Sequence, residues 1–156
     1  MRWGIREDAS DDHTTRSVCL SELSSCKRLS VGPHFVALLG QKYGFRTFPA
    51  AIEVAVFDML RATLLEQRDK YQVSLLAEWF RVDDNMVPAH YVLQPVSSKI
   101  PEFVLGENPE AQRAAREKWY GIHGELHNML LASAEIGHQR GVLSEGLYKQ
   151  FKVSST

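Results

Sequence analysis

The chain has 156 residues, which suits one domain or one domain with a helical extension. Its 44% hydrophobic content is ordinary for a globular protein, and its net charge of −1 comes from 18 basic and 19 acidic residues that are interspersed. This balance argues against nucleic acid or a membrane surface as a partner, and no apolar run approaches the roughly 18 residues that a bilayer span needs.

The N-terminal segment, residues 1–12, is acidic and lacks the apolar stretch of a secretory signal. The two cysteines, Cys19 and Cys26, are seven residues apart in a helical pattern. Their α-carbons are therefore expected about 10 Å apart, beyond the reach of a disulfide. These features predict a reducing, cytoplasmic setting.

The first expected helix covers residues 14–29. Cys19, Leu23 and Cys26 recur at i, i+4 and i+7, so we expect this face to be packed, with the cysteines as small core residues. Asp12 or Thr14 is placed to cap the helix.

A buried strand is expected at residues 35–39. This run is continuously apolar, opens after Gly32-Pro33 and closes at Gly40, a pattern typical of a strand in a parallel sheet. The side chains expected to be almost fully buried are Phe35, Val36, Leu38 and Leu39.

The loop after such a strand is where open α/β sheets place their ligands. Gly40, Lys42, Tyr43 and Gly44 are therefore candidate site residues. The alternative interpretation is a tight turn that the glycines permit, with Tyr43 packed over it.

The next expected helix covers residues 50–66, with Pro49 in or near its first turn and an apolar face that runs nearly all round. After a polar break the helical pattern continues to Arg81, and residues 82–85 have the chemistry of a turn. Tyr91–Leu93 is β-prone, but Pro88 and Pro95 bracket it closely, so we expect an edge strand. Residues 97–107 are expected to form a loop.

Two helices are expected at the C-terminal end. Asn108-Pro109 is typical of a cap followed by a first-turn proline, and apolar residues then alternate three and four apart as far as Ile136. Gly121 and Gly124 each weaken this helix by about 1 kcal/mol relative to alanine. Ser144 is placed to cap a last short helix that ends near Phe151.

Two clusters carry possible chemistry. His123 and His127 are one helical turn apart, a spacing that suits a metal, but no third ligand is obvious and Glu125 is not placed as in zincins. The alternative is a pair of solvated or partly buried helix histidines. Asp11-Asp12-His13 suits a cation or acid–base chemistry, and the alternative is that Asp12 only caps the helix. The sequence contains no P-loop, no Gly-x-Ser-x-Gly and no Gly-x-Gly-x-x-Gly.

Several unusual motifs then occur in a familiar order between residues 2 and 101. They resemble the N-terminal region of the NACHT and WD repeat domain-containing proteins. Members of that family are large cytosolic signal-transduction ATPases with a TIR-like α/β domain, a NACHT ATPase and WD40 propellers. The motifs are Arg2-Trp3-Gly4-Ile5, Asp12-His13, Cys19-Leu20-x-Glu22-Leu23-x-x-Cys26, Gly32-Pro33-x-Phe35 to Gly44, Trp79-Phe80-Arg81-Val82-Asp83-Asp84-Asn85-x-Val87-Pro88 and Tyr91-Val92-Leu93-Gln94-Pro95.

The resemblance implies an α/β fold with an incomplete TIR-like (flavodoxin-like) parallel sheet of few strands, in a chain dominated by helices. The expected organisation is a partial TIR-like domain over residues 1–101, a linker over 102–108 and a helical segment over 109–156. The family's first βα unit would precede Arg2, so we expect an exposed sheet edge that favours self-association. Arg2 and Trp3 of the first motif join the candidate site residues.

The implied function is interaction with protein partners, or with NACHT and WD40 regions, and regulation of an attached ATPase without catalysis in this chain. No catalytic, cofactor-binding or metal-binding residue is assigned, and ATP would belong to a NACHT domain. One alternative is NAD or nucleotide hydrolysis. Related TIR-like domains often have an acidic residue just before the phenylalanine of the helix that follows the central strand, and some TIR enzymes use a nearby glutamate to cleave NAD. Here Val56 precedes Phe57, and Glu53 and Asp58 lie about 60° and 160° round the helix from Val56. Another alternative is a non-functional truncated product.

Overall fold

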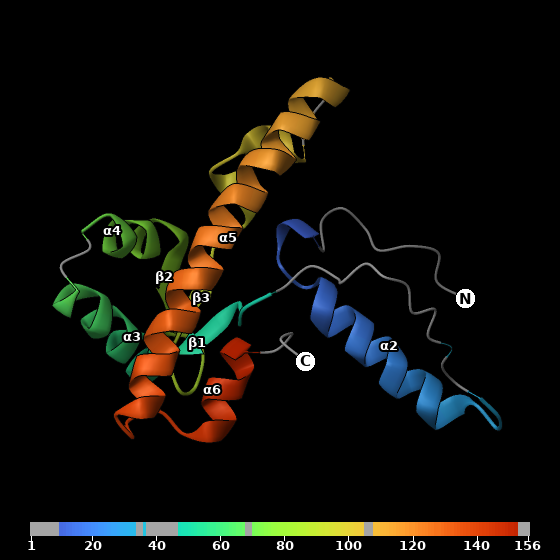
Figure 1. The fold of residues 1–156 in the computed structure, drawn as a ribbon. Coiled ribbons are helices and arrows are strands. Elements are labelled where there is room, and N and C mark those ends of the chain that lie inside the picture. Colours follow the sequence, from blue (N-terminus) through green and yellow to red (C-terminus); the bar gives the residue numbers. More distant parts are fainter. Residues whose placement is uncertain (1–9, 34–35, 37–46, 68–69, 105–107, 153–156) are drawn as a thin grey trace.

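The structure is a computed structural model that describes residues 10–33, 36, 47–67, 70–104 and 108–152. Helices make up most of these residues, as expected, and one small sheet lies among them (Figure 1). The elements are α2 (Thr15–Leu29), β1 (Ala51–Glu53), α3 (Val54–Glu66), α4 (Lys70–Trp79), β2 (Phe80–Asp83), β3 (His90–Leu93), the 3-10 turns η1 (Val96–Ser98) and η2 (Pro101–Phe103), α5 (Pro109–Gln139) and α6 (Glu145–Lys152).

The sheet has the order β1-β3-β2, and both pairs are antiparallel. The expected strand at Tyr91–Leu93 is present as β3, but it is the central strand and not an edge. The two prolines lie outside the four paired residues, so they remove no hydrogen bond from the ladder. The parallel sheet is not confirmed, because the described strands pair antiparallel and the expected strand at residues 35–39 lies outside the described residues apart from Val36.

The outer strand β1 lies in a segment that was expected to be helical, and β2 covers the expected end of a helix and the start of a turn. Pro49 precedes β1 and not a helix, and α3 begins only at Val54, whose backbone N–H donates to Ala89 O at 3.1 Å. The helix expected to continue to Arg81 ends at Trp79, and Phe80 begins β2 opposite Leu93. Pairing with β3 therefore overrides the local helical pattern at both places.

The core lies where α5 crosses the other elements, and α5 contacts α3, α4, α6 and η2. Residues on both sides of segment 102–108 contribute to it. The rings of Trp79 and Trp119 have centroids 4.8 Å apart. The largest fully buried side chains are those of Trp79, Phe57, Leu60, Leu64, Leu76, Leu126, Leu130, Val96 and Ser133.

Both ends of α5 have the expected chemistry. Asn108 Oδ1 accepts a hydrogen bond from the Glu110 backbone N–H at 2.9 Å, so the expected cap is confirmed. At the other end Gly141 has a φ of +73°, its N–H donates to His138 O, and the Val142 N–H donates to Gly137 O. These two bonds form a Schellman motif, which favours glycine at the left-handed position.

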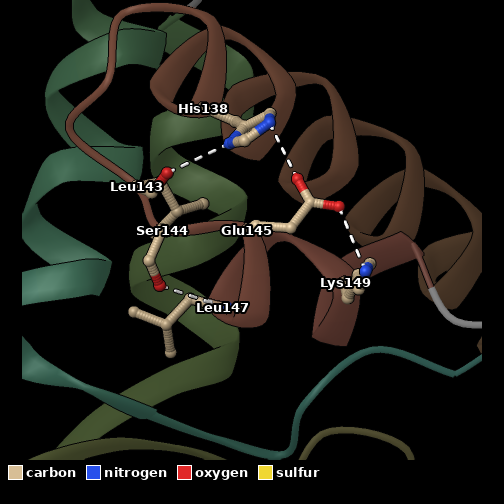
Figure 2. A network of polar contacts seen from close by, with 6 residues as sticks. All are labelled: His138, Leu143, Ser144, Glu145, Leu147 and Lys149. Carbon is tan, nitrogen blue, oxygen red and sulfur yellow. Dashed lines mark hydrogen bonds and ion pairs between the residues drawn. The ribbon is translucent and has the colours of Figure 1, made fainter.

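A polar network then turns the chain from α5 into α6 (Figure 2). The two ring nitrogens of His138 contact Leu143 O at 3.1 Å and the Glu145 carboxylate at 3.0 Å, and Glu145 also pairs with Lys149 at 3.3 Å. Ser144 Oγ accepts from the Leu147 N–H at 3.4 Å, which places Ser144 at the start of α6 as expected. The network fixes α6 against the end of α5.

The helix α2 lies beside the packed body and not within it (Figure 1). None of its residues is buried, and Cys19 and Cys26 are exposed, so the expectation that they are core residues is wrong. Val36, expected to be buried, is also exposed, while Phe35, Leu38 and Leu39 lie outside the described residues. An apolar stripe shows that a helix face can be buried, but it does not specify what buries it.

Candidate functional site

The chain just before α2 is fixed to the body by Asp11. This side chain is only 8% exposed, and its two oxygens accept hydrogen bonds from Ser97, one from the backbone N–H at 2.6 Å and one from the hydroxyl at 2.7 Å. Hydrogen bonds to a charged acceptor are worth about 1.5–3 kcal/mol each. Asp11 therefore joins the segment before α2 to η1.

His13 makes a second attachment two residues later. Its Nε2 lies 2.8 Å from Gln94 O, and its ring lies 5.3 Å from that of Trp119 on α5. Its φ of +59° is uncommon for a residue other than glycine, and such a conformation persists only where the surroundings hold it. We call Asp11, His13, Gln94, Ser97 and Trp119 the clasp.

A buried imidazole lies behind the clasp. His123 stacks on Phe48 with ring centroids 4.6 Å apart, and its ring meets that of Trp119 edge-on at 5.5 Å. Burial, with smaller contributions from His127 and His13, lowers the pKa of His123 to about 4. Burial also lowers the pKa of His13, although Gln94 and the two neighbouring aspartates oppose this change. The site therefore holds neutral imidazoles near pH 7.

The two clusters that the sequence singled out meet at Trp119, whose ring contacts both His13 and His123. His123 and His127 are 6% and 8% exposed, so they are more deeply buried than the expected solvated or partly buried histidines. Asp12 is exposed, and Thr14 occupies the N-cap position without a side-chain cap bond. Within the described ranges no group of three or more His, Cys, Asp or Glu side chains could hold a metal ion.

The remaining candidates fall into two groups, of which only the first lies in the described residues. Glu53 ends β1 and is exposed, Val56 packs against the core, and Asp58 pairs with Arg61 at 3.6 Å on the surface of α3. The candidate residues of the first motif and of the loop after residue 39 lie outside the described residues, and these are Arg2, Trp3, Gly40, Lys42, Tyr43 and Gly44.

A second feature is the exposed side of α2, which the sequence interpretation missed. Arg16, Leu20, Leu23 and Lys27 follow one another at spacings of four, three and four, and all four are exposed. The leucines are 52% and 37% exposed. The sequence contains this signal as two leucines flanked by two basic residues. The neighbouring stripe with the two cysteines is the longer apolar pattern, so that stripe was expected to be the packed face. We call these four residues the α2 row.

Comparison with known proteins decides the family. NACHT domain- and WD repeat-containing protein 1 from Mus musculus is 43% identical over 152 residues, which cover 86% of this chain and 10% of that protein. NACHT and WD repeat domain-containing protein 2 from Homo sapiens is 30% identical over 155 residues, which cover 99% of this chain and 9% of that protein. The chain belongs with the NACHT and WD repeat domain-containing proteins.

The chain spans about a tenth of the length of the curated relatives it matches. No protein-family model matches it, and no solved structure does. Two of the motifs that carry the resemblance to the NACHT and WD repeat proteins meet in the clasp, because His13 of the Asp12-His13 motif contacts Gln94 of the Tyr91–Pro95 motif. Among the described residues, no helix has both the length and the apolar character needed to cross a bilayer.

Proposed function

We propose that this chain is an interaction and regulatory region of a cytoplasmic NACHT and WD repeat protein, and that it has no catalytic activity of its own. The observation that carries the proposal is α2, a helix of 15 residues without one buried side chain. Isolated helices of this length are marginal in water, and most helices in proteins are stabilised by packing of one face. A partner that packs against this uncovered helix would therefore stabilise it.

The clasp connects this surface to the body. Asp11 and His13 contact η1, the residue after β3 and the middle of α5, so the start of α2 shares contacts with the core. A partner that moves α2 must strain or open these contacts. This route supports a regulatory role in which binding at α2 changes how the body meets the attached ATPase.

A direct test of the proposed function uses the part of a relative that this chain does not match. The 156-residue chain would be added to the NACHT-containing remainder of the mouse relative, and both binding and ATP hydrolysis would be measured. The proposal expects binding together with a change in the hydrolysis rate. It also expects an Asp11→Ala, Ser97→Ala double variant to alter the effect on the rate more than the affinity. The alternative of a non-functional product expects neither binding nor a rate change, and that result would overturn the proposal.

The alternative function is hydrolysis of NAD or a nucleotide by this chain. Glu53 is exposed at the end of β1, and Asp58 pairs with Arg61 on α3. The hollow of about 290 Å³ between η2 and α5 is lined mainly by alanine and isoleucine, with Glu102 and Lys118 as its charged residues. Incubation of the chain with NAD tests the alternative, because released nicotinamide would show a catalytic function.

The TIR-like description and self-association also belong to this proposal. A further βα unit placed before Arg2 is expected to complete a parallel sheet around residues 35–39. The described sheet has two edges, β1 and β2, which are only three and four residues long, and short edge strands limit edge-to-edge pairing. Sedimentation of the chain with and without such a unit tests whether the unit suppresses association.

A further inference from the structure

We propose that the α2 row binds an acidic amphipathic helix of a protein partner. This inference rests on the proposed interaction function and names the chemistry of the partner. The four residues of the row lie within about 60° of arc, because successive residues of an α-helix are about 100° apart. Leu20 and Leu23 form the centre, and Arg16 and Lys27 lie one turn beyond them on either side.

The row lies on the more exposed side of α2. Within α2, Thr15, Val18 and Ser25 are half-buried, whereas every residue of the row is exposed. The two sets lie about 160° apart round the helix axis. The row is therefore the more accessible side of the helix, with the exposed Cys19 and Cys26 next to the leucines.

The charges of α2 indicate which kind of partner helix the row binds. The helix carries Arg16, Lys27 and Arg28 but only one acidic residue, and its first turn has no acid. A partner helix with two apolar side chains three or four residues apart would cover the leucines. Acidic side chains one turn beyond those two would lie opposite Arg16 and Lys27. Complementary charge fixes register and speeds association, while two leucines bury little area, so the interaction is expected to be weak and sensitive to salt.

Other occupants fit less well. A second copy of α2 would bring the basic residues of two identical rows together, and like charges across an interface are unfavourable. Interfacial membrane helices carry many basic residues and aromatic side chains, but α2 has three basic residues and no aromatic one. The exposed serines Ser17, Ser21 and Ser24 lie about 70–130° round the helix from the centre of the row.

The test uses the full 156-residue chain and a defined probe. The probe is a synthetic helical peptide with two leucines bracketed by glutamates at the spacing of the row, labelled with a fluorophore. A second peptide replaces each glutamate with lysine. Fluorescence anisotropy at about 50 mM salt is expected to show binding of the acidic peptide and no binding of the basic one. An Arg16→Glu, Lys27→Glu variant is expected to lose about tenfold or more in affinity for the acidic peptide.

Two further measurements make the test specific. The same charge-reversed variant is expected to bind the basic peptide, which shows that it is folded and that charge decides the partner. Arg28→Glu is the matched control, since Arg28 lies on the same helix about 110° from the centre of the row. Its affinity for the acidic peptide is expected to stay within about threefold of the wild-type value. Circular dichroism would check that each variant keeps its helix content.

Several results would overturn the inference. These are no binding of the acidic peptide, equal binding of both peptides, equal effects of Arg28→Glu and the double reversal, or capture by anionic phosphatidylserine vesicles in place of the peptide. A dimer in sedimentation that the double reversal abolishes would assign the row to a second copy and also overturn it. If the double reversal leaves binding to the NACHT-containing remainder intact, only the inference about the row fails. If the wild-type chain binds neither the remainder nor the peptide, the proposed function fails as well.

Discussion

Asp11 and Ser97 are 86 residues apart in the sequence, yet two hydrogen bonds join them through one carboxylate. Beside this pair, His13 contacts Gln94 and Trp119, so two side chains just before α2 both attach the chain to the body. Changes at these two side chains should therefore weaken the attachment and leave the core of α3, α4 and α5 intact.

The first prediction is that Asp11→Ala loosens α2. The substitution leaves the backbone N–H and hydroxyl of Ser97 without their acceptor, which should cost about 2–3 kcal/mol in the free energy of local opening. Hydrogen exchange is expected to speed up by about 30-fold or more in residues 10–29, with little change in α5. Asp12→Ala is the control, because Asp12 is exposed. Equal acceleration in both variants would contradict the clasp.

The second prediction concerns pH. The pKa of His123 is about 4 in the folded chain and near 6.5 in the unfolded chain, so the unfolded state takes up the extra proton first as pH falls. Stability attributable to this group is therefore full above about pH 6.5 and declines as pH falls towards 4. The largest loss of stability from this group is about 3 kcal/mol, because each pH unit between the two pKa values corresponds to about 1.4 kcal/mol.

Urea unfolding of wild type and His123→Gln between pH 7 and pH 4.5 measures this effect. The variant is expected to lose stability less steeply with falling pH. His90→Gln is the matched control, since His90 is only partly buried and its Nδ1 lies 2.6 Å from Pro88 O, away from the clasp. It should keep the wild-type slope. Identical slopes for all three proteins would show that His123 is not held neutral.

The sequence predicted the long helix near the C-terminal end better than the short strands in the middle of the chain. The helix α5 was predicted well, because a long period of three and four residues and the Asn108 cap are local signals. The strands β1 and β2 were missed, since three or four residues carry little pattern of their own and are paired only through β3. Asp11 and His13 of the clasp were singled out in the sequence as part of the Asp11-Asp12-His13 cluster. Their partners could not be identified from the sequence, because they lie more than 80 residues away.

The third prediction is that Ser133→Ala keeps or raises stability. Ser133 is fully buried and its hydroxyl has no hydrogen-bond partner among the described residues. Removing an unpartnered buried hydroxyl relieves a desolvation penalty of about 1–3 kcal/mol, offset in part by the small space it leaves. Thr63→Val is the comparison, because Thr63 Oγ1 donates to Met59 O at 3.0 Å and its loss is expected to cost about 1 kcal/mol. Thermal unfolding of both variants checks the signs, and a clear destabilisation by Ser133→Ala would refute the assignment.

The fourth prediction uses two glycines of the α5 region. Gly141 has a positive φ in the Schellman motif, so Gly141→Ala is expected to cost about 1 kcal/mol. Gly121 lies inside α5 with nothing within 4 Å of the position a β-carbon would take, so Gly121→Ala is expected to stabilise by up to about 1 kcal/mol. The midpoint of chemical unfolding should therefore fall for Gly141→Ala and rise for Gly121→Ala. Shifts of the same sign would mean that α5 does not end as described.

The chain is attached to the body before α2 and again before β1, at neighbouring residues of one strand end. His13 contacts Gln94 O, and Ala50 O accepts from the Leu93 backbone N–H at 2.8 Å. Loop-closure entropy grows slowly with length, by about 0.6 kcal/mol for each doubling, so the number of residues between the two attachments has little effect on the free energy of the fold. Replacing Thr15–Leu29 with a short glycine-serine bridge, which keeps the buried Phe48, should therefore leave β1, β3 and α5 in place. The body is then expected to tolerate changes in the length of α2.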